Sequence, residues 1–324
     1  MIIVTGALGF IGSNLLAELE RRGYEDLVSI DTFGTDDKWK NVAKRSCVSF
    51  VFPDQTFDFI NKNKDNIKAL IHLGAISSTT EKDVDLIARN NIQLTMELYQ
   101  FCTENRIPFI YASSAATYGH GKNEGGFLDD ESLGFLQTLR PLNPYGWSKL
   151  SVDKLIAKDK MRHSLSSQVV GLKFFNVYGP NEYHKGGQKS VIPQFFKQYQ
   201  EVGYAKLFIT NGAKRDFVFV DDCVDVMIWM LEHPQVSGLF NVGTGEAATF
   251  EDVAECVAKS MGIEPNIEHI EMPEGLARQY QFFTQSSTDK LRSVGYPHQM
   301  HNIHQGVEKY VKEFLLKGDD LKYR

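Results

Sequence analysis

The first 23 residues contain the feature that most constrains this chain. Residues 1–5 form a short apolar run with β-branched members, which predicts a buried strand, and residues 13–23 predict a helix. Between them stand Gly6, Gly9 and Gly12. Glycines at this spacing permit a tight turn, close approach to a pyrophosphate and close helix–strand packing, while the helix N-terminus offers free N–H groups to the phosphates. The stretch therefore predicts a dinucleotide-binding strand–turn–helix unit.

Strand-like apolar runs then alternate with helical segments along the first half of the chain. The expected strands cover residues 1–5, 27–31, 47–52, 68–75, 108–114 and 168–178. Nearly continuous apolar strands separated by helices are typical of parallel sheets that are covered on both faces. The pattern therefore predicts an α/β fold with a Rossmann-type, doubly wound parallel sheet.

The pattern changes after Pro180, and this change predicts a smaller, discontinuous α/β substrate domain. We expect the nucleotide-binding domain to comprise residues 1–180, about 216–243 and the C-terminal helix, with residues 217–220 returning to it as a strand. We expect the substrate domain to comprise about 181–215 and 244–300. The apolar stripe of the helix at residues 304–316 predicts packing against the main body.

Composition excludes several classes of function. The net charge of −6 argues against general nucleic-acid binding, which depends on clustered lysine and arginine. The cysteines lack metal-type spacing, so we expect buried reduced thiols and no metal site. They are Cys47, Cys102, Cys223 and Cys256. No apolar run reaches the roughly 18 residues of a membrane span, and no signal-peptide pattern precedes the first strand. We therefore expect a cytoplasmic protein with neither a nucleic-acid nor a membrane partner.

The second expected strand ends at Asp31, 19 residues after Gly12. That spacing is typical of the acid that hydrogen-bonds an adenosine ribose and favours NAD. Lys38 follows in a polar loop, and a cation there favours the 2′-phosphate of NADP. Both cofactors therefore remain open. Small residues from Gly74 to Thr80 follow the fourth expected strand and are expected to pass close to the cofactor.

The second informative stretch reads Asn-Pro-Tyr-Gly-Trp-Ser-Lys and ends at Lys149. Asn143 suits a helix N-cap and Pro144 the first helical position, so Tyr145 and Lys149 lie four apart on one helix face. A free phenol has a pKa near 10, and a nearby ammonium lowers that value by roughly one to three units. Tyr145 is thus a candidate acid/base for a substrate hydroxyl. Lys149 is a candidate partner of a nicotinamide ribose, and Ser114, at a strand end, is expected to bond the same substrate oxygen.

These motifs resemble those of the extended short-chain dehydrogenases/reductases, a superfamily of nucleotide-sugar epimerases, dehydratases and reductases. A closer resemblance is to the ADP-L-glycero-D-manno-heptose 6-epimerase family. The stretches that carry it are residues 74–81, 111–119, 174–180, 184–186, 214–217 and 280–285, which span nearly the whole chain. The run His184-Lys185-Gly186 is the most specific, because generic sugar epimerases lack it.

The resemblance implies an isomerase that inverts C6 of an ADP-linked heptose, a precursor of the lipopolysaccharide core. It implies hydride transfer to tightly bound NADP and return of the hydride to the opposite face. Inversion through one fixed hydride donor needs either a moving intermediate or two proton handlers. By position in the family these are Tyr145 and Lys185. The resemblance also implies a homo-oligomer, specifically a homopentamer.

Other contacts follow from the same resemblance. Those expected for the cofactor are Gly6, Gly9, Phe10, Ile11, Gly12, Asp31, Thr32, Lys38, Leu73, Gly74, Ala75, Ile76, Ser77, Asn90, Tyr145, Lys149, Val177 and Lys185. Those expected for the substrate are Ser114, Asn176, Gly187, Gln194, Phe208, Arg215 and Tyr280. Arginine gives planar, bidentate contacts to phosphate, as Arg215 would to the ADP group.

The chain departs from the family pattern at residues 41–55, 119–141 and 187–190. Pro53 stands near the place of an expected second cofactor lysine, and Thr32 stands where asparagine is usual. These departures leave NADP versus NAD and the pocket rim open. Two other functions also remain open. One is a nucleotide-sugar 4-epimerase or dehydratase of the same superfamily, and the other is a non-catalytic dinucleotide-binding protein.

Overall fold

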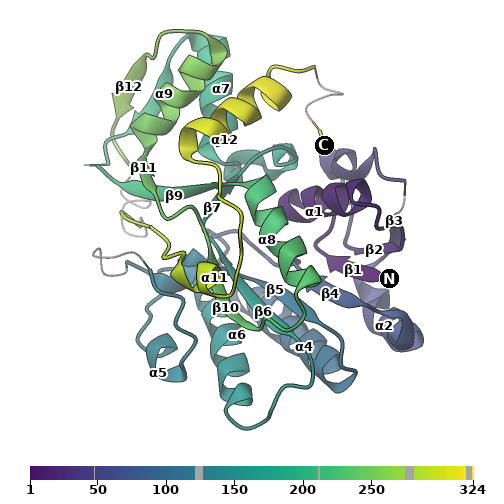
Figure 1. Ribbon diagram of the computed structural model, residues 1–324. Coiled ribbons are helices and arrows are strands. Elements are labelled where there is room, and N and C mark those ends of the chain that lie inside the picture. Colours follow the sequence, from purple (N-terminus) through teal and green to yellow (C-terminus); the bar gives the residue numbers. More distant parts are fainter. Residues whose placement is uncertain (47, 121–126, 211, 274–280, 319–322) are drawn as a thin grey trace.

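The computed structural model describes residues 1–46, 48–120, 127–210, 212–273, 281–318 and 323–324. Its largest element is a seven-stranded parallel sheet in the order β10-β6-β5-β4-β1-β2-β3 (Figure 1). The strands are β1 (Ile2–Thr5), β2 (Leu27–Ile30), β3 (Val48–Val51), β4 (Ala69–His72), β5 (Phe109–Ser114), β6 (Val169–Phe174) and β10 (Gly238–Val242). This topology confirms the predicted Rossmann-type fold.

Helices cover both faces of this sheet because successive side chains of each strand point to opposite faces. Ile2 and Val4 of β1 join the core beneath α1 and α8, whereas Ile3 joins a second core beneath α2, α4 and α6. The helices of this part are α1 (Phe10–Arg21), α2 (Thr56–Asn63), α3 (Val84–Ile87), α4 (Leu94–Glu104), α5 (Leu133–Leu136), α6 (Pro144–Lys160), α8 (Val220–Glu232) and α11 (Asp289–Ser293). Helical segments of other types are η1 (Asp37–Val42), η2 (Pro53–Gln55), η3 (Lys64–Asn66), η4 (Ala88–Gln93), η5 (Ala115–Tyr118), η6 (Tyr183–Gln188) and η7 (Val311–Leu315).

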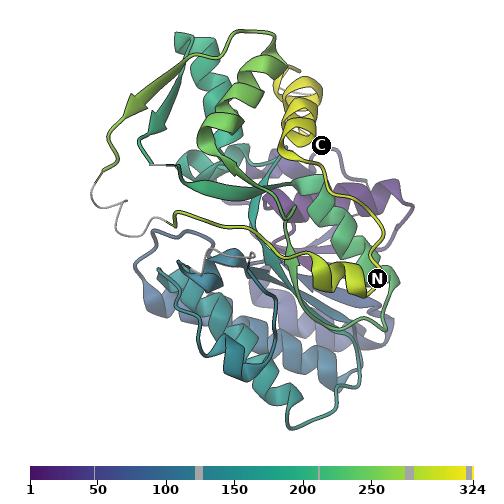
Figure 2. The ribbon, with the colours of Figure 1, turned by 60° about the vertical axis from the view of Figure 1, so that its left-hand side comes forward.

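A smaller α/β part lies beyond one end of the main sheet, at the top of Figure 1 and of Figure 2. It contains a three-stranded sheet, β11-β9-β7, and a two-stranded sheet, β12-β8. Its strands are β7 (Asn176–Tyr178), β8 (Ala205–Phe208), β9 (Lys214–Phe219), β11 (Ala247–Thr249) and β12 (Ile267–Ile270). Its helices are α7 (Val191–Val202), α9 (Phe250–Met261) and α12 (Ile303–Tyr310). Segments distant in sequence therefore assemble this part, which makes it discontinuous.

Three local expectations differ from the structure. The predicted strand 168–178 is two strands, because the chain leaves the main sheet after Phe174 and pairs β7 with β9. Residues 217–219 therefore belong to the smaller sheet, and β10 supplies the seventh main strand. The last helix packs on α9 and β9 rather than on the main sheet, burying Val307, Tyr310 and Val311 there (Figure 1).

Two further sequence expectations concern cysteines and membranes. Cys102, Cys223 and Cys256 are buried free thiols, and Cys47 lies outside the described residues. Within the described ranges, no helix has the length and apolar character that crossing a bilayer requires.

Candidate active site

A cavity of about 980 Å³ lies where the main sheet meets the smaller part. Its lining includes residues at or just beyond the carboxyl ends of β1, β2, β4, β5 and β6, together with residues of β7, η6 and the start of α7. Ligands of open parallel α/β sheets bind beyond the carboxyl ends of the strands. The cavity therefore occupies the position that the fold favours for a ligand.

The glycine turn at the start of α1 lines this cavity. Gly6 has a φ of +65°, and a Cβ there would lie 2.5 Å from the backbone nitrogen of Gly74. A Cβ on Gly12 would lie 2.3 Å from the carbonyl oxygen of Gly6. The N-cap of α1 is Gly9, which provides no side-chain cap. The N–H groups of the first helical turn are thus accessible to a phosphate, so this turn fits the pyrophosphate of a dinucleotide.

Asp31 joins the glycine turn to the loop that follows β2. Its Oδ2 accepts a hydrogen bond from Leu8 N at 2.9 Å, and its Oδ1 accepts one from Thr32 N at 2.7 Å. Lys38 Nζ donates to the same Oδ1 at 2.7 Å and to the carbonyl oxygen of Thr32 at 2.8 Å. The acid and the lysine that gave opposing cofactor signals are therefore one ion pair at the edge of the cavity.

Helix α6 carries Tyr145 and Lys149 to the cavity. Asn143 caps the helix by accepting a hydrogen bond from Gly146 N at 2.8 Å, and Pro144 is the first helical residue, as predicted. Burial raises the pKa of Tyr145, and a hydrogen bond with Ser114 lowers it in part. Burial lowers the pKa of Lys149 to about 8. In this structure Ser114, rather than Lys149, is the group that lowers the pKa of Tyr145.

Lys185 reaches the same cavity from η6, a different element from the α6 helix that carries Tyr145. Gly186, with a φ of +55°, turns the chain immediately after it. Lys185 Nζ lies 5.3 Å from the centroid of the Phe10 ring. Burial lowers the pKa of Lys185, and the Glu182 carboxylate opposes that effect. A lysine with a lowered pKa has more neutral amine near neutral pH, so it is suited to accept a proton.

The loop that holds Lys185 is fixed at both ends. Glu182 is fully buried, and its two carboxylate oxygens accept hydrogen bonds from the backbone and the hydroxyl of Ser190, both at 2.6 Å. Asn41 Nδ2 donates to Leu8 O at 2.9 Å and lies 3.1 Å from His184 Nδ1. Asn41 therefore links the loop to the glycine turn. His184 is thus one of the residues that hold this loop.

Most of the sequence-predicted residues meet at this cavity. They are Gly6, Gly9, Phe10, Ile11, Gly12, Asp31, Lys38, Leu73, Gly74, Ala75, Ser77, Ser114, Tyr145, Lys149, Asn176, Val177, Lys185 and Gly187. Six other expected residues that the structure describes do not line this cavity. They are Thr32, Ile76, Asn90, Gln194, Phe208 and Arg215. Tyr280 lies outside the described residues.

The residues that do not line the cavity have contacts elsewhere. Asn90 donates to Leu86 O at 2.8 Å, and Gln194 donates to Lys189 O at 2.8 Å. The Arg215 guanidinium lies 6.0 Å from the Phe250 ring centroid. Phe208 lines a second cavity of about 210 Å³, and Phe250 lines both cavities.

Asn91, next to the predicted Asn90, is one residue that the sequence analysis missed. Its Oδ1 accepts from Ile76 N at 2.8 Å, and its Nδ2 donates to Ile76 O and to Ser148 Oγ, both at 3.0 Å. The π-helical turn η4 contains Asn91, and such turns often occur at functional sites. Two adjacent asparagines beside an apolar helix face were the available signal. Asn91 joins the small-residue loop after β4 to helix α6.

The fold and the site together define an enzyme of the short-chain dehydrogenase/reductase type with a dinucleotide site. The model of the NAD dependent epimerase/dehydratase family matches residues 2–243, so the chain belongs to that family. A protein of Fusobacterium nucleatum named ADP-L-glycero-D-manno-heptose-6-epimerase is 43% identical to this chain. The match covers 98% of this chain and 99% of that protein.

Solved structures support the same family. The crystal structure of Helicobacter pylori ADP-L-glycero-D-manno-heptose-6-epimerase has a TM-score of 0.81 and 25% identity, covering 96% of this chain and 94% of that one. A UDP-N-acetylglucosamine 4-epimerase from Methanobrevibacter ruminantium also has a TM-score of 0.81, at 21% identity and 96% coverage of each chain. The fold alone therefore does not distinguish among the substrates of this family.

Proposed function

We propose that this enzyme is an ADP-glyceromanno-heptose 6-epimerase, which converts ADP-D-glycero-D-manno-heptose to ADP-L-glycero-D-manno-heptose. One observation carries the proposal: Tyr145 and Lys185 line one cavity from two different parts of the fold. Two proton handlers in one cavity allow the hydroxyl to be deprotonated in one orientation and reprotonated in the other. Relatives with that name, 42–43% identical over nearly the full chain, support the substrate.

The dinucleotide of the family, for which we propose NADP, supplies a reversible hydride acceptor when bound. We propose that the glycine turn and Asp31 hold its pyrophosphate and adenosine ribose. Lys38 forms an ion pair with Asp31, and we propose that its ammonium also binds the ribose 2′-phosphate of NADP. If Lys38 pairs with Asp31 alone, NAD is the alternative cofactor. We propose that Lys149 and Val177 face the nicotinamide end, and both line the cavity.

The two acid/bases would act in turn. In one direction Tyr145, aligned by Ser114, takes the proton of the C6 hydroxyl while the hydride leaves C6, which gives a ketone. The intermediate then turns so that its other face receives the hydride, and Lys185 returns a proton to the oxygen. The reverse reaction exchanges these roles. The hydride and its two electrons return to C6, so the reaction has no net redox change. Tyr145 ends the turnover with the proton of the original hydroxyl and Lys185 without the proton that it donated, so proton exchange with solvent restores both side chains before the next turnover.

For the substrate we propose that Ser114, Asn176 and Gly187 contact the heptose, since all three line the main cavity. Phe208 lines the adjoining smaller cavity, and Phe250 is common to both. We therefore assign the ADP end of the substrate to the smaller cavity, with Gln194, Arg215 and Tyr280 as further contacts. We propose that residues 1–180 hold most of the cofactor and that the smaller part, which includes β9 and the C-terminal helix in the structure, holds most of the substrate.

We also infer a cytoplasmic homo-oligomer, with five subunits as the family resemblance implies. Light scattering coupled to gel filtration would give a mass of about five chains; a monomer would contradict this inference. Fractionation of the source cells would place the protein with the cytosol rather than the envelope.

Chromatographic separation of the two C6 epimers tests the proposed activity. Purified protein incubated with either epimer should produce the same equilibrium mixture of both. Absence of interconversion, with turnover of UDP-sugars at C4 instead, would favour the 4-epimerase alternative. Protein that carries no nicotinamide nucleotide and acts on no nucleotide sugar would favour the non-catalytic alternative.

A further inference from the structure

Asp153 and Lys173 form a buried ion pair one helical turn of α6 beyond Lys149. Asp153 lies on α6 four residues after Lys149, so the two residues share a face of the helix with Tyr145. Lys173 Nζ lies 2.7 Å from Asp153 Oδ2, and both side chains have no exposed surface. Burial of two charges is costly, so a pair in this position requires an explanation beyond packing.

Hydroxyl groups at the end of β5 complete the surroundings of this pair. Asp153 Oδ2 accepts from Ser113 Oγ at 2.8 Å, and Oδ1 accepts from Tyr111 OH at 3.1 Å. Lys173 Nζ also donates to Thr117 Oγ1 at 2.7 Å. Ser113 immediately precedes Ser114, so the Asp153–Lys173 pair fixes helix α6 to the end of β5 that carries the candidate catalytic residue Ser114.

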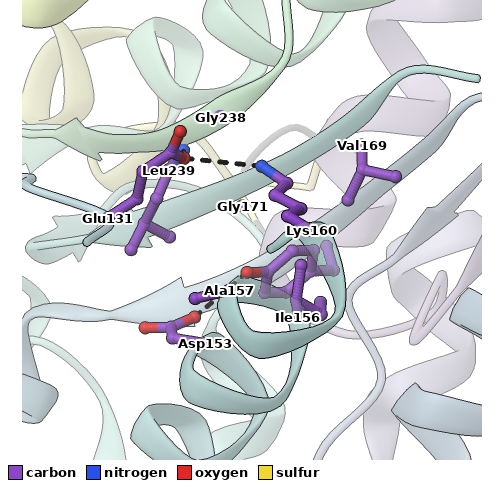
Figure 3. Close-up of a pocket in the computed structure, with 10 residues that line it drawn as sticks. Glu131, Asp153, Ile156, Ala157, Lys160, Val169, Gly171, Gly238 and Leu239 are labelled. Carbon is purple, nitrogen blue, oxygen red and sulfur yellow. Dashed lines mark hydrogen bonds and ion pairs between the residues drawn. The ribbon is translucent and has the colours of Figure 1, made fainter. Parts of the chain in front are cut away.

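Figure 3 shows Asp153 on α6, beside a small cavity of about 10 Å³. Glu131 and Lys160 lie on the other side of this cavity and form a partly exposed ion pair at 3.5 Å. Lys160 is on the same helix as Asp153, but its charge is accessible to solvent. It therefore offers a matched control for the buried pair, because solvent screens exposed charges much more strongly.

Asp153 is also the carboxylate that acts on Lys149. Burial lowers the pKa of Lys149, and the Asp153 carboxylate opposes that effect. His72 of β4 faces Lys149 as well, but burial and Lys149 lower its pKa to about 3, so it carries no charge near neutral pH. Burial raises the pKa of Tyr145, so its resting phenol form adds no charge beside Lys149. Asp153 thus supplies the negative charge near Lys149.

We propose that Asp153 and Lys173 are positioning residues for the Tyr145–Lys149 pair. Asp153 keeps Lys149 in its ammonium form within the site, and Lys173 fixes Asp153 in place and partly cancels its charge. The role in turnover rests on the proposed epimerase function, whereas the effect on Lys149 does not. Neither side chain lines the large cavity, so both act through Lys149.

The test measures the titration of Lys149 in two ways. One is NMR of protein labelled with ε-¹³C lysine, in which the Lys149 signal is identified by its loss in Lys149→Met. The other is the pH profile of kcat/KM for C6 epimerisation, whose alkaline limb should follow the loss of the ammonium. The variants are Asp153→Asn, Lys173→Met, the double variant of both, and the control Lys160→Gln.

We expect Asp153→Asn to lower the Lys149 midpoint and the alkaline limb by about one pH unit. The double variant should lower both by a smaller amount, because it also removes the ammonium of Lys173 that partly cancels the Asp153 charge. Lys173→Met should raise the midpoint, because the uncancelled carboxylate favours the ammonium, and Lys160→Gln should leave it unchanged. The double variant contains no unpaired buried charge, so it tests the proposal even if Asp153→Asn does not fold.

A Lys149 midpoint that stays at the wild-type value in the double variant would overturn the proposal, whatever the activity of that variant. If wild-type protein did not epimerise the substrate, the proposed function would fail while the NMR titration still decided this inference.

Discussion

Lys185 Nζ lies 5.3 Å from the centre of the Phe10 ring, so the loop lysine rests on the first residue of helix α1. The glycine turn and the lysine loop are far apart in sequence, yet they share this contact and the hydrogen bonds of Asn41. The structure therefore joins the predicted dinucleotide site to the second proposed acid/base. A cofactor that remains bound through the cycle is consistent with this arrangement.

Replacement of Lys185 tests its proposed role directly. Lys185→Ala should lower kcat for C6 epimerisation by about 10²–10⁴-fold, the usual contribution of a general acid/base. Bound nucleotide should remain, since other residues hold the pyrophosphate. Lys197→Ala is a suitable control, because Lys197 is 71% exposed on α7. Epimerisation at the wild-type rate in Lys185→Ala would contradict the two-sided mechanism.

Ser114 should control the pH dependence of Tyr145. Its hydrogen bond lowers the pKa of Tyr145 against the effect of burial, so Ser114→Ala should raise that pKa. The limb of the kcat profile that requires deprotonated Tyr145 should move to higher pH. Tyr145→Phe should abolish that limb and lower kcat by about 10²–10⁴-fold. A Ser114→Ala profile identical to that of wild type would exclude this coupling.

Gly12 should be necessary for nucleotide binding. A Cβ at this position would meet the carbonyl oxygen of Gly6 at 2.3 Å, so Gly12→Ala should displace the turn from α1. Protein carrying this change should be purified without bound nucleotide, as measured by absorbance of the extract from denatured protein. Gly134→Ala provides the control, because a Cβ there meets nothing within 4 Å. Full nucleotide content in Gly12→Ala would be inconsistent with the assigned pyrophosphate site.

Lys38 should set the preference between the two dinucleotides. If its ammonium faces the ribose 2′-phosphate, Lys38→Ala should weaken NADP binding by about tenfold or more and leave NAD binding nearly unchanged. Calorimetry on nucleotide-free protein measures both affinities. Lys40→Ala removes a neighbouring charge that pairs with Asp37 and serves as the control. Equal losses for NADP and NAD would show that Lys38 acts only through Asp31.

Local patterns predicted the main sheet, the glycine turn and the Asn143–Lys149 stretch because each depends on residues close in sequence. The division of residues 168–178 into two strands could not be predicted, since β7 leaves the main sheet only because β9 is available to pair with it. Asn91 was missed in favour of Asn90, because two adjacent asparagines give no local signal of which one is buried, as Asn91 is within the π-helical turn.

Long-range packing set the remaining limits of prediction. Phe208 and Arg215 were expected at the substrate site, but only the assembled β8 and β9 show that they lie outside the main cavity. The Asp153–Lys173 pair was not anticipated either. Its members are 20 residues apart, and each reads alone as an ordinary charged residue of a helix or strand.

The fate of the hydrogen on C6 tests the central claim most directly. ADP-D-glycero-D-manno-heptose carrying deuterium at C6 is incubated with the enzyme in ordinary water, and the isolated L-glycero product is examined by mass spectrometry and NMR. We predict that the product retains the deuterium at C6, because the hydride leaves and returns within one bound complex. Loss of the deuterium to solvent, or no formation of the L-glycero epimer, would contradict the account.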